Sequence, residues 1–434
     1  MYKTLSAPLV VQIEATYRCP CKCRHCYNFW RQYAKTEIMP SLTEKQMGQI
    51  SDQLIKHKVF HVVMTGGEPL VNKKVVFSGI EKLRKNNITV GINSNLIPLK
   101  PRDAKLIKTL GVSGVLTSLL GPDANSHEAI TLRLGSFNET IRGIRLLQEA
   151  RVPVMVNMVV SKDNKHLLRA TAELVKRLGI TRFYSTRAAC PGNCSDFSGL
   201  ALSLDEFRAY LKEFHQIGVN QGLKVGVLES YPLCGMKDID LFPELVGRRC
   251  LAGVTSLTIG ANCDIRPCSH LDTTYGNILS EDLVSIWKKM QDWRTGAFLP
   301  ETCKFCKLLP KCGGGCRMEA KMINGSLNAL DPYSSLEDIQ YVLSLENKRE
   351  KTWPQPLPPT FQLNPKIRWR DESFGSIAYL GQRSGCFLNR DATEFVKKLR
   401  LGRNYQTCKI VSKYGEGTKE FLQGLCEKKV LISI

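Results

Sequence analysis

The stretch Cys19-Pro-Cys21-Lys-Cys23-Arg-His-Cys26 holds four of the chain's 17 cysteines and directly follows a predicted strand at Leu9–Thr16. It contains the spacing C-x3-C-x2-C through Cys19, Cys23 and Cys26. Clustered cysteines in a chain without an export signal bind metal or iron–sulfur clusters more often than they form disulfides. Zinc is the alternative, but zinc favours four ligands in paired C-x2-C units. Three thiolates without a nearby fourth indicate a cluster with one open iron.

A second cysteine group lies in a region, Pro232 to Ser335, whose turns are rich in glycine, notably Gly313-Gly314-Gly315. This composition favours a small domain folded around metal clusters over one with a broad apolar core. The group consists of Cys250, Cys263, Cys268, Cys303, Cys306, Cys312 and Cys316.

Apolar runs alternate with amphipathic stretches through the first half of the chain, which predicts six β/α units and hence a parallel sheet or partial (β/α)6 barrel. The predicted strands are Leu9–Thr16, Val59–Thr65, Ile88–Asn93, Gly114–Leu119, Pro153–Val160 and Thr181–Arg187. The predicted helices are Thr43–His57, Lys73–Lys85, Pro101–Leu110, Ser136–Ala150, Lys165–Leu178 and Ser203–Val219. Gly66-Gly67-Glu68-Pro69 follows the second strand. We therefore expect it on the same rim as the first cysteine group.

A proline-rich linker, Trp353 to Pro359, precedes a compact unit at residues 361–434. This unit has 14 basic and 7 acidic side chains, so its charge is 14 − 7 = +7. Its predicted strands are Pro365–Trp369 and Gly375–Leu380, its predicted helices are Asp391–Leu399 and Thr418–Glu427, and a short apolar segment, Val430–Ile434, ends it.

Length and charge narrow the functional classes. A chain of 434 residues predicts about three domains, and no apolar run is long enough to span a membrane. No signal peptide is recognised, so we expect a cytoplasmic protein. The net charge, 61 − 40 = +21, is too diffuse to indicate nucleic acid. It would attract an acidic electron donor such as flavodoxin or ferredoxin, and an acidic peptide.

These motifs resemble those of the radical S-adenosylmethionine (SAM) enzymes. The resemblance implies that Cys19, Cys23 and Cys26 hold a [4Fe-4S] cluster with an open iron site, and that His25 takes a usual place before the third ligand. The stretch containing Ser118, His127 and Gly135-Ser136-Phe137 resembles that of peptide-modifying members, with Leu120 where the family has Asp. The SAM-binding residues implied by the resemblance are Gly66, Gly67, Glu68, Ser118, Asn164 and Arg187.

The second cysteine group resembles the SPASM extension, which binds one or two auxiliary iron–sulfur clusters. By this resemblance Cys250, Cys268 and Cys316 hold the first auxiliary cluster, with Cys263 at a position where glycine is usual. Cys303, Cys306 and Cys312 would hold the second, one thiolate short because Ser334 occupies the place of the last cysteine. That shortage leaves open whether the second cluster has an open iron for substrate, is labile or is lost.

The C-terminal unit resembles a RiPP recognition element, a small winged-helix domain that binds the leader of a ribosomally made precursor peptide by strand addition. The segment Ile367 to Gly375 carries this resemblance. A winged helix that binds nucleic acid or a protein partner is the alternative. The implied domains are 1–230 (radical SAM core), 231–347 (SPASM-like), 348–360 (linker) and 361–434 (leader binding).

The resemblance implies a peptide maturase that cleaves SAM reductively and abstracts hydrogen from a precursor peptide, giving a thioether, a carbon–carbon crosslink or a related change. The alternatives are an enzyme that oxidises a protein Cys or Ser to formylglycine and a non-enzymatic metal-binding partner protein. No catalytic residue is assigned. An epimerising enzyme would need a thiol hydrogen donor, for which the candidates are Cys21, Cys190, Cys194 and Cys234. Cys386, Cys408 and Cys426 are expected to be core residues.

Overall fold

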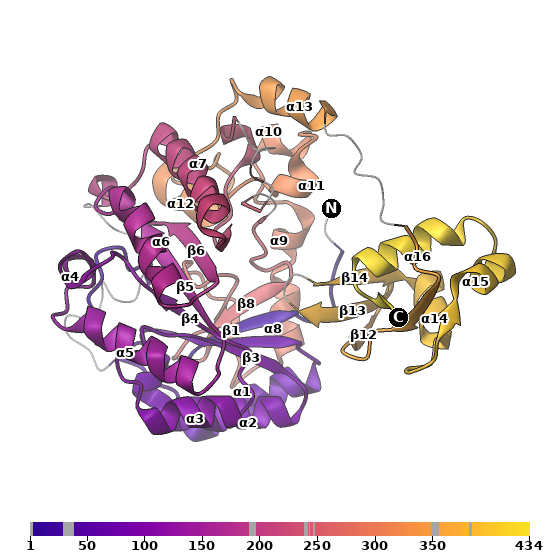
Figure 1. Cartoon of the computed structure of the whole chain (residues 1–434), viewed down its shortest axis with the longest axis horizontal. Helices are drawn as coiled ribbons and strands as arrows, with labels where there is room; N and C mark the ends of the chain where they lie inside the picture. Colours follow the sequence, from indigo (N-terminus) through magenta and orange to yellow (C-terminus); the bar gives the residue numbers. More distant parts are fainter. Residues whose placement is uncertain are drawn as a thin grey trace. The chain divides into compact units, whose positions relative to one another are not determined.

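The computed structural model describes residues 3–28, 39–190, 197–237, 242, 244–245, 248–348, 356–381 and 384–434. The chain divides into two compact units, Met1–Arg349 and Glu350–Ile434 (Figure 1). Each unit has its own apolar core. Within the described ranges, no helix combines the length and the apolar character that crossing a bilayer requires.

The first unit is organised around a sheet whose neighbouring strands β1 to β7 are all parallel. This confirms the six predicted strands and adds a short seventh. The strands are β1 (Val10–Glu14), β2 (His61–Thr65), β3 (Thr89–Asn93), β4 (Val115–Ser118), β5 (Val154–Val160), β6 (Arg182–Arg187) and β7 (Lys224–Val227).

Helices connect these strands and cover the outer side of the sheet (Figure 1). The six predicted helices are confirmed, although the stretch predicted from Lys165 opens with a 3-10 turn, and α4 is additional. Each presents an apolar stripe to the strands, as α6 does with Leu168, Ala172 and Val175. The helices are α1 (Glu44–Lys56), α2 (Lys73–Lys85), α3 (Pro101–Thr109), α4 (Ala124–Thr131), α5 (Ser136–Glu149), α6 (Leu168–Arg177) and α7 (Leu204–Gln221). The fold is the predicted partial (β/α)6 barrel.

The cysteine-rich region continues the barrel sheet instead of forming a separate layer. Strand β8 (Ser256–Ile259) pairs in parallel with β1, and β9 (Asp264–Arg266) and β10 (Gly276–Asn277) extend the sheet from there. Leu257, Ile259 and Trp287 are buried in the barrel core as a result. The expectation of a region without a broad apolar core is wrong for this part, because pairing with β1 lets these strands share the existing core.

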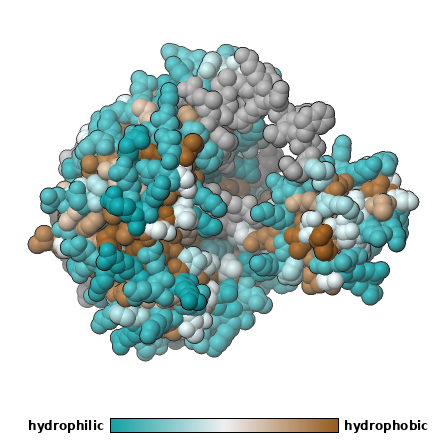
Figure 2. Space-filling view, in the orientation of Figure 1, coloured by the Kyte–Doolittle hydropathy of each residue, from teal (hydrophilic) through white to brown (hydrophobic). Residues whose placement is uncertain are grey.

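Short helices complete the cysteine-rich region and present its later cysteines. They are α8 (Leu283–Lys289), α9 (Gln291–Thr295), α10 (Glu301–Lys304), α11 (Leu309–Cys312), α12 (Arg317–Asn324) and α13 (Ile339–Lys348). Figure 2 shows mostly hydrophilic residues over the visible face of the barrel helices.

The second unit contains two three-stranded antiparallel sheets, ordered β15-β11-β16 and β12-β13-β14. The meander β12-β13-β14 leads into three helices, and Phe361, Val396 and Leu422 are buried in the core. The elements are β11 (Thr360–Leu363), β12 (Arg368–Glu372), β13 (Gly375–Gly381), β14 (Ser384–Asn389), α14 (Arg390–Lys398), β15 (Tyr405–Gln406), α15 (Thr407–Tyr414), α16 (Thr418–Glu427) and β16 (Leu431–Ser433). The winged-helix description of this unit stays a prediction.

Trp287 tests the shared core. Its side chain is fully buried, and its indole Nε1 donates to the Leu5 carbonyl at 2.8 Å. We expect Trp287→Ala to lower the free energy of unfolding by roughly 3–5 kcal/mol, because it leaves a large cavity. Val219→Ala, at an exposed position on α7, should cost less than about 0.5 kcal/mol. Urea unfolding followed by circular dichroism compares the two variants. A cysteine-rich region that melts alone while the barrel keeps its stability would contradict the shared core.

Candidate active site

The loop that carries the first cysteines follows β1 at the carboxyl edge of the barrel sheet. Cys26 donates its backbone N–H to the Cys23 carbonyl at 3.1 Å, which closes a turn over Arg24 and His25. The backbone N–H groups of Lys22 and Arg24 donate to two carbonyls of α4, those of Thr131 and Ile130, both at 3.0 Å. The loop is therefore held by α4, a helix that the sequence did not reveal.

The side chains of Cys19, Cys21 and Cys23 lie together in this loop. The buried Cys21 thiol is in hydrogen-bond contact with Cys19 and Cys23. Asn95, after β3, places its amide Nδ2 3.7 Å from the Cys19 sulfur and 3.9 Å from that of Cys21. Asn95 has no recognisable motif in the sequence, yet it is the residue of the neighbouring rim that reaches these thiols.

Two glycines allow the rim after β2 to approach the cysteine loop. The Gly67 N–H donates to the Thr16 carbonyl at 2.7 Å, and Glu68 N–H to that of Arg18 at 2.9 Å. A Cβ on Gly66 would lie 2.4 Å from the Thr16 oxygen, and one on Gly67 would lie 2.3 Å from that of Arg18. Only residues without a side chain fit against this segment.

Glu68 is fully buried, and its carboxylate orders the rim around it. It accepts hydrogen bonds from Leu70 N–H at 2.9 Å, the Ser94 hydroxyl at 2.7 Å and Asn95 N–H at 2.7 Å. Burial raises the pKa of Glu68 to about 7, against the opposing effect of these hydrogen bonds. The bond from the Asn95 N–H to Glu68 holds Asn95 in place, and the Asn95 side chain reaches the cysteine sulfurs.

The predicted stretch around Ser118 and His127 forms the next part of the rim. Burial lowers the pKa of His127 to about 4, and its Nδ1 accepts from the Leu120 N–H at 3.2 Å. The Leu120 carbonyl accepts from the Asn164 amide at 3.0 Å. Leu120, which stands in the place of an acidic residue, therefore connects the rim through its backbone. Ser118 ends β4 beside Asn157 of β5.

Asn164 is fully buried, and both ends of its amide are bonded within the protein. Besides the bond to Leu120, Nδ2 donates to the Val159 carbonyl at 2.9 Å, and Oδ1 accepts from Ser161 N–H at 2.8 Å. The described contacts of this side chain tie the ends of β4 and β5 together.

Arg187 ends β6 and connects the barrel to the cysteine-rich region. Its Nη1 donates to the Glu319 carboxylate of α12 at 3.1 Å, with both side chains almost completely buried. Its guanidinium lies 4.2 Å from the Tyr333 ring centre. Burial alone would lower the pKa of Arg187. The carboxylates of Glu319 and Asp331 raise this pKa by more than burial lowers it, so it lies above its ordinary value. Glu319 also accepts from Cys190 N–H at 3.0 Å.

Cys250 raises the pKa of both Cys268 and Cys316 electrostatically, so the three thiols lie near one another. Burial raises the pKa of the Cys268 thiol to about 11 and that of Cys316 well above its ordinary value. The Tyr27 ring stacks on that of His270 at 4.1 Å between centres. Tyr27 adjoins Cys26, and the His270 N–H donates to the Cys268 sulfur at 3.5 Å, so this stack joins the two cysteine groups.

Cys303, Cys306 and Cys312 form a separate group on the turns around α10 and α11. Cys306 N–H donates to the Cys303 carbonyl at 3.1 Å, and Cys312 N–H donates to that of Leu308 at 2.8 Å. Cys263 lies apart, in a turn with a left-handed φ of 69°. That backbone favours glycine, which explains why glycine is usual at this position. Cys194 lies outside the described residues.

The three cysteine groups fit iron–sulfur clusters better than single ions. In the ranges that the structure covers, no three His, Cys, Asp or Glu side chains converge on one metal ion, and no cysteine forms a disulfide. A [4Fe-4S] cluster distributes its thiolates over different irons, so its ligands need not converge on one point. Buried thiols with raised pKa values ionise when metal binds. Among the described residues, the buried Oδ1 of Asn28, two positions after Cys26, has no hydrogen-bond partner.

Family comparisons agree with this geometry. Residues 13–175 match the model of the Radical SAM superfamily, and residues 250–312 match SPASM, an iron–sulfur cluster-binding domain. The chain is a radical SAM enzyme with a SPASM domain, and its cofactors are iron–sulfur clusters and SAM. This assignment removes the non-enzymatic alternative.

Two kinds of curated relative illustrate the range of this class. The AdoMet-dependent heme synthase of Nitratidesulfovibrio vulgaris is 25% identical over 338 residues, which cover 74% of this chain and 90% of the relative. The PqqA peptide cyclase of Granulibacter bethesdensis is 25% identical over 357 residues, which cover 78% and 90%.

Solved structures share the fold. The enzyme anSMEcpe with bound AdoMet has a TM-score of 0.63 at 18% identity, over 79% of this chain and all of that one. Streptococcus suis SuiB, bound to its precursor peptide SuiA, has a TM-score of 0.60 at 18% identity, over 75% of each chain. At these identities the similarity shows the fold alone.

The Arg187–Glu319 pair gives a prediction about stability. Removing one partner leaves a buried charge alone, so we expect Glu319→Ala to lower the free energy of unfolding by roughly 3–5 kcal/mol. Glu81→Ala breaks an exposed pair with Lys85 on α2 and should cost about 0.5 kcal/mol or less. Anaerobic urea unfolding measures both values. Equal losses in the two variants would show that the buried pair does not join the regions as described.

Proposed function

We propose that the protein is a peptide maturase that uses SAM to abstract hydrogen from a ribosomally made precursor peptide. The observation that carries the choice of a peptide is the second unit, which has its own core and free sheet edges and belongs to the same chain as a radical SAM domain. The product would be a thioether, a carbon–carbon crosslink or a related modification.

Cys19, Cys23 and Cys26 are proposed to hold the cluster that binds SAM. When bound, the cluster and SAM together supply a 5′-deoxyadenosyl radical by reductive cleavage. The Cys23–Cys26 turn and the contacts with α4 fix the two ends of the loop, and the adjacent glycine rim brings backbone close to it. Asn95 would donate to one of the cluster's thiolates, that of Cys19, and so stabilise its charge.

Gly66, Gly67, Glu68, Ser118, Asn164 and Arg187 are retained as the proposed SAM-side residues. Glu68, Asn164 and Arg187 are bonded to protein groups in the structure, so their proposed contribution is first to position the rim. A methionine ammonium near Glu68 would favour its ionised form, because opposite charge lowers the pKa that burial has raised.

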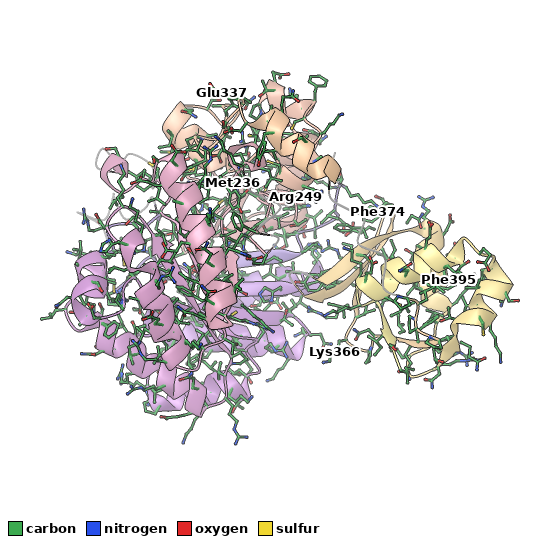
Figure 3. All side chains as sticks on the ribbon, turned by 45° about the horizontal axis from the view of Figure 1, so that its top comes forward. Met236, Arg249, Glu337, Lys366, Phe374 and Phe395 are labelled. Carbon is green, nitrogen blue, oxygen red and sulfur yellow. The ribbon has the colours of Figure 1, made fainter. Side chains whose placement is uncertain are left out.

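The second unit is proposed to bind the leader of the precursor. In its described part, β12 and β14 each pair with β13 on one side, so each leaves an edge for strand addition. Phe387 on β14 is 41% exposed and contacts Phe374, near the β12–β13 turn. Phe374 lies between β12 and β13, and Phe395 lies on α14; both are labelled in Figure 3. The unit's charge of +7 would attract an acidic leader.

The names of relatives support more than one substrate class. The PqqA peptide cyclases and the peptide-bound SuiB structure favour a peptide, whereas the heme synthases favour a haem precursor as a second candidate. Oxidation of a protein Cys or Ser to formylglycine stays the alternative within peptide chemistry. A flavodoxin or ferredoxin is the proposed electron donor, attracted by the chain's positive charge.

The radical chemistry is tested by the first cysteine group. Cys23→Ala should abolish the release of 5′-deoxyadenosine from SAM in the reduced, anaerobically reconstituted enzyme, because the cluster loses one of three ligands. Cys408 is exposed, so the expectation that it lies in the core of the second unit is wrong. Cys408→Ala therefore removes a surface thiol and should keep wild-type release. Chromatography of the nucleoside measures both. Wild-type release by Cys23→Ala would contradict the assigned cluster.

Leader binding is tested by deleting residues 361–434. The truncated enzyme should still cleave SAM but lose modification of the leader-bearing precursor, measured by mass spectrometry. In the full chain, Phe387→Ser should weaken leader affinity about tenfold, as the loss of an interface anchor does, whereas Leu401→Ser, at another exposed position, should not.

Modification at the wild-type rate by the truncated enzyme would contradict leader docking. A wild-type chain that leaves precursor peptides unchanged but converts a haem precursor would support the second candidate function instead.

A further inference from the structure

The group Cys303, Cys306 and Cys312 has a fourth thiol beside it that the spacing of the sequence does not reveal. Cys234 lies 69 residues before Cys303, in the 3-10 turn Leu233–Gly235. It interacts electrostatically with all three members of the group. Four thiols from two distant segments therefore lie near one another.

Two contacts fix the turn that carries Cys234. On one side of Cys234, the Leu233 N–H donates to the Cys312 sulfur at 3.3 Å. On the other, Gly235 lies against the Tyr333 carbonyl, where a Cβ would come within 2.0 Å of the oxygen. The buried Met236, labelled in Figure 3, follows directly and donates its N–H to the Leu233 carbonyl at 3.0 Å. The thiol is thus presented from a closely packed turn.

Ser334, which comes from a segment after α12, also lies near the Cys234 thiol. The same thiol lies near the Ser335 backbone. Asp331 holds this segment through bonds to Tyr333 N–H at 2.9 Å and Cys316 N–H at 2.7 Å. Position 334 and the Cys234 sulfur are therefore neighbours, although 100 residues separate them in the sequence.

We propose that Cys234 is the fourth protein ligand of an iron–sulfur cluster held by Cys303, Cys306 and Cys312. Ser334 then donates a hydrogen bond to the ligating sulfur, a contact of the kind that orients ligands and tunes the potential of such clusters. On binding, Cys234 releases its thiol proton and becomes a thiolate. The cluster is closed by protein, so it carries electrons and does not bind substrate at an open iron.

The decisive variant is Cys234→Ala in the full chain, reconstituted anaerobically with iron and sulfide. We expect one electron paramagnetic resonance signal to change or disappear, because one iron loses its protein ligand, and the iron content to fall by up to about four per chain, the content of one [4Fe-4S] cluster. The signal that responds to SAM should persist. Cys263→Gly is the matched control, since it removes a buried thiol from the same region at a left-handed position that suits glycine, and it should keep all its iron.

A ligand exchange separates loss of a ligand from loss of folding. Cys234→Ala combined with Ser334→Cys places a thiol at the neighbouring position and should restore the missing iron and signal. Full iron content and unchanged spectra in Cys234→Ala would overturn the proposal, as would failure of the double variant to regain iron.

Alkylation of the wild-type enzyme needs no substitution. Iodoacetamide should label Cys234 at least tenfold more slowly in the reconstituted enzyme than after iron chelation, in parallel with Cys312. Rapid labelling of Cys234 while Cys303, Cys306 and Cys312 stay protected would exclude it as a ligand. These readouts do not depend on the substrate, so they can fail while SAM cleavage and peptide modification succeed, and the reverse.

Discussion

The close contact between two backbone segments, Gly66–Glu68 and Thr16–Arg18, positions everything around the first cysteine group. The Thr16 and Arg18 carbonyls accept from the glycine rim, and Cys19 follows immediately. Because a Cβ at either glycine would overlap a carbonyl oxygen, the contact exists only where both side chains are absent. Glu68 then orders Asn95, whose amide reaches the thiols. One backbone contact thus connects three loops of the barrel rim.

The cysteine-rich region is joined to this rim by groups that lie inside the protein. Strand β8 pairs with β1, a buried ion pair connects Glu14 of β1 to Arg266 of β9, and the Tyr27 ring stacks on His270. Buried ion pairs add little net stability but penalise any arrangement that separates the partners. The barrel and this region are consequently one body with one core, which suits electron transfer between cysteine groups because their separation stays fixed.

The sequence predicted the barrel well because strands buried on both faces are continuous apolar runs, as in Pro153–Val160. It missed β7, whose Lys224–Val227 is short and begins with a charge, and α4, whose apolar pattern is weak. The pairing of β8 with β1 joins residues about 245 positions apart, and no local pattern encodes it. The cysteine groups were found because spacing within a turn is local. Asn95 and Glu319 were not, because their partners come from other elements.

Ser334 shows why a ligand set is better defined in space than by spacing. A motif compares residue types at fixed offsets, so a serine at position 334 indicates a missing ligand. A cluster requires only a sulfur at the right place, and a backbone turn fixed by Cys312 on one side and Tyr333 on the other can supply it from any point in the chain. The serine hydroxyl near the Cys234 thiol would then have a role of its own, because a hydrogen bond to a ligating sulfur favours the reduced cluster. On this argument Ser334 is part of the site without being a ligand, and the fourth ligand is Cys234 of the turn Leu233–Gly235.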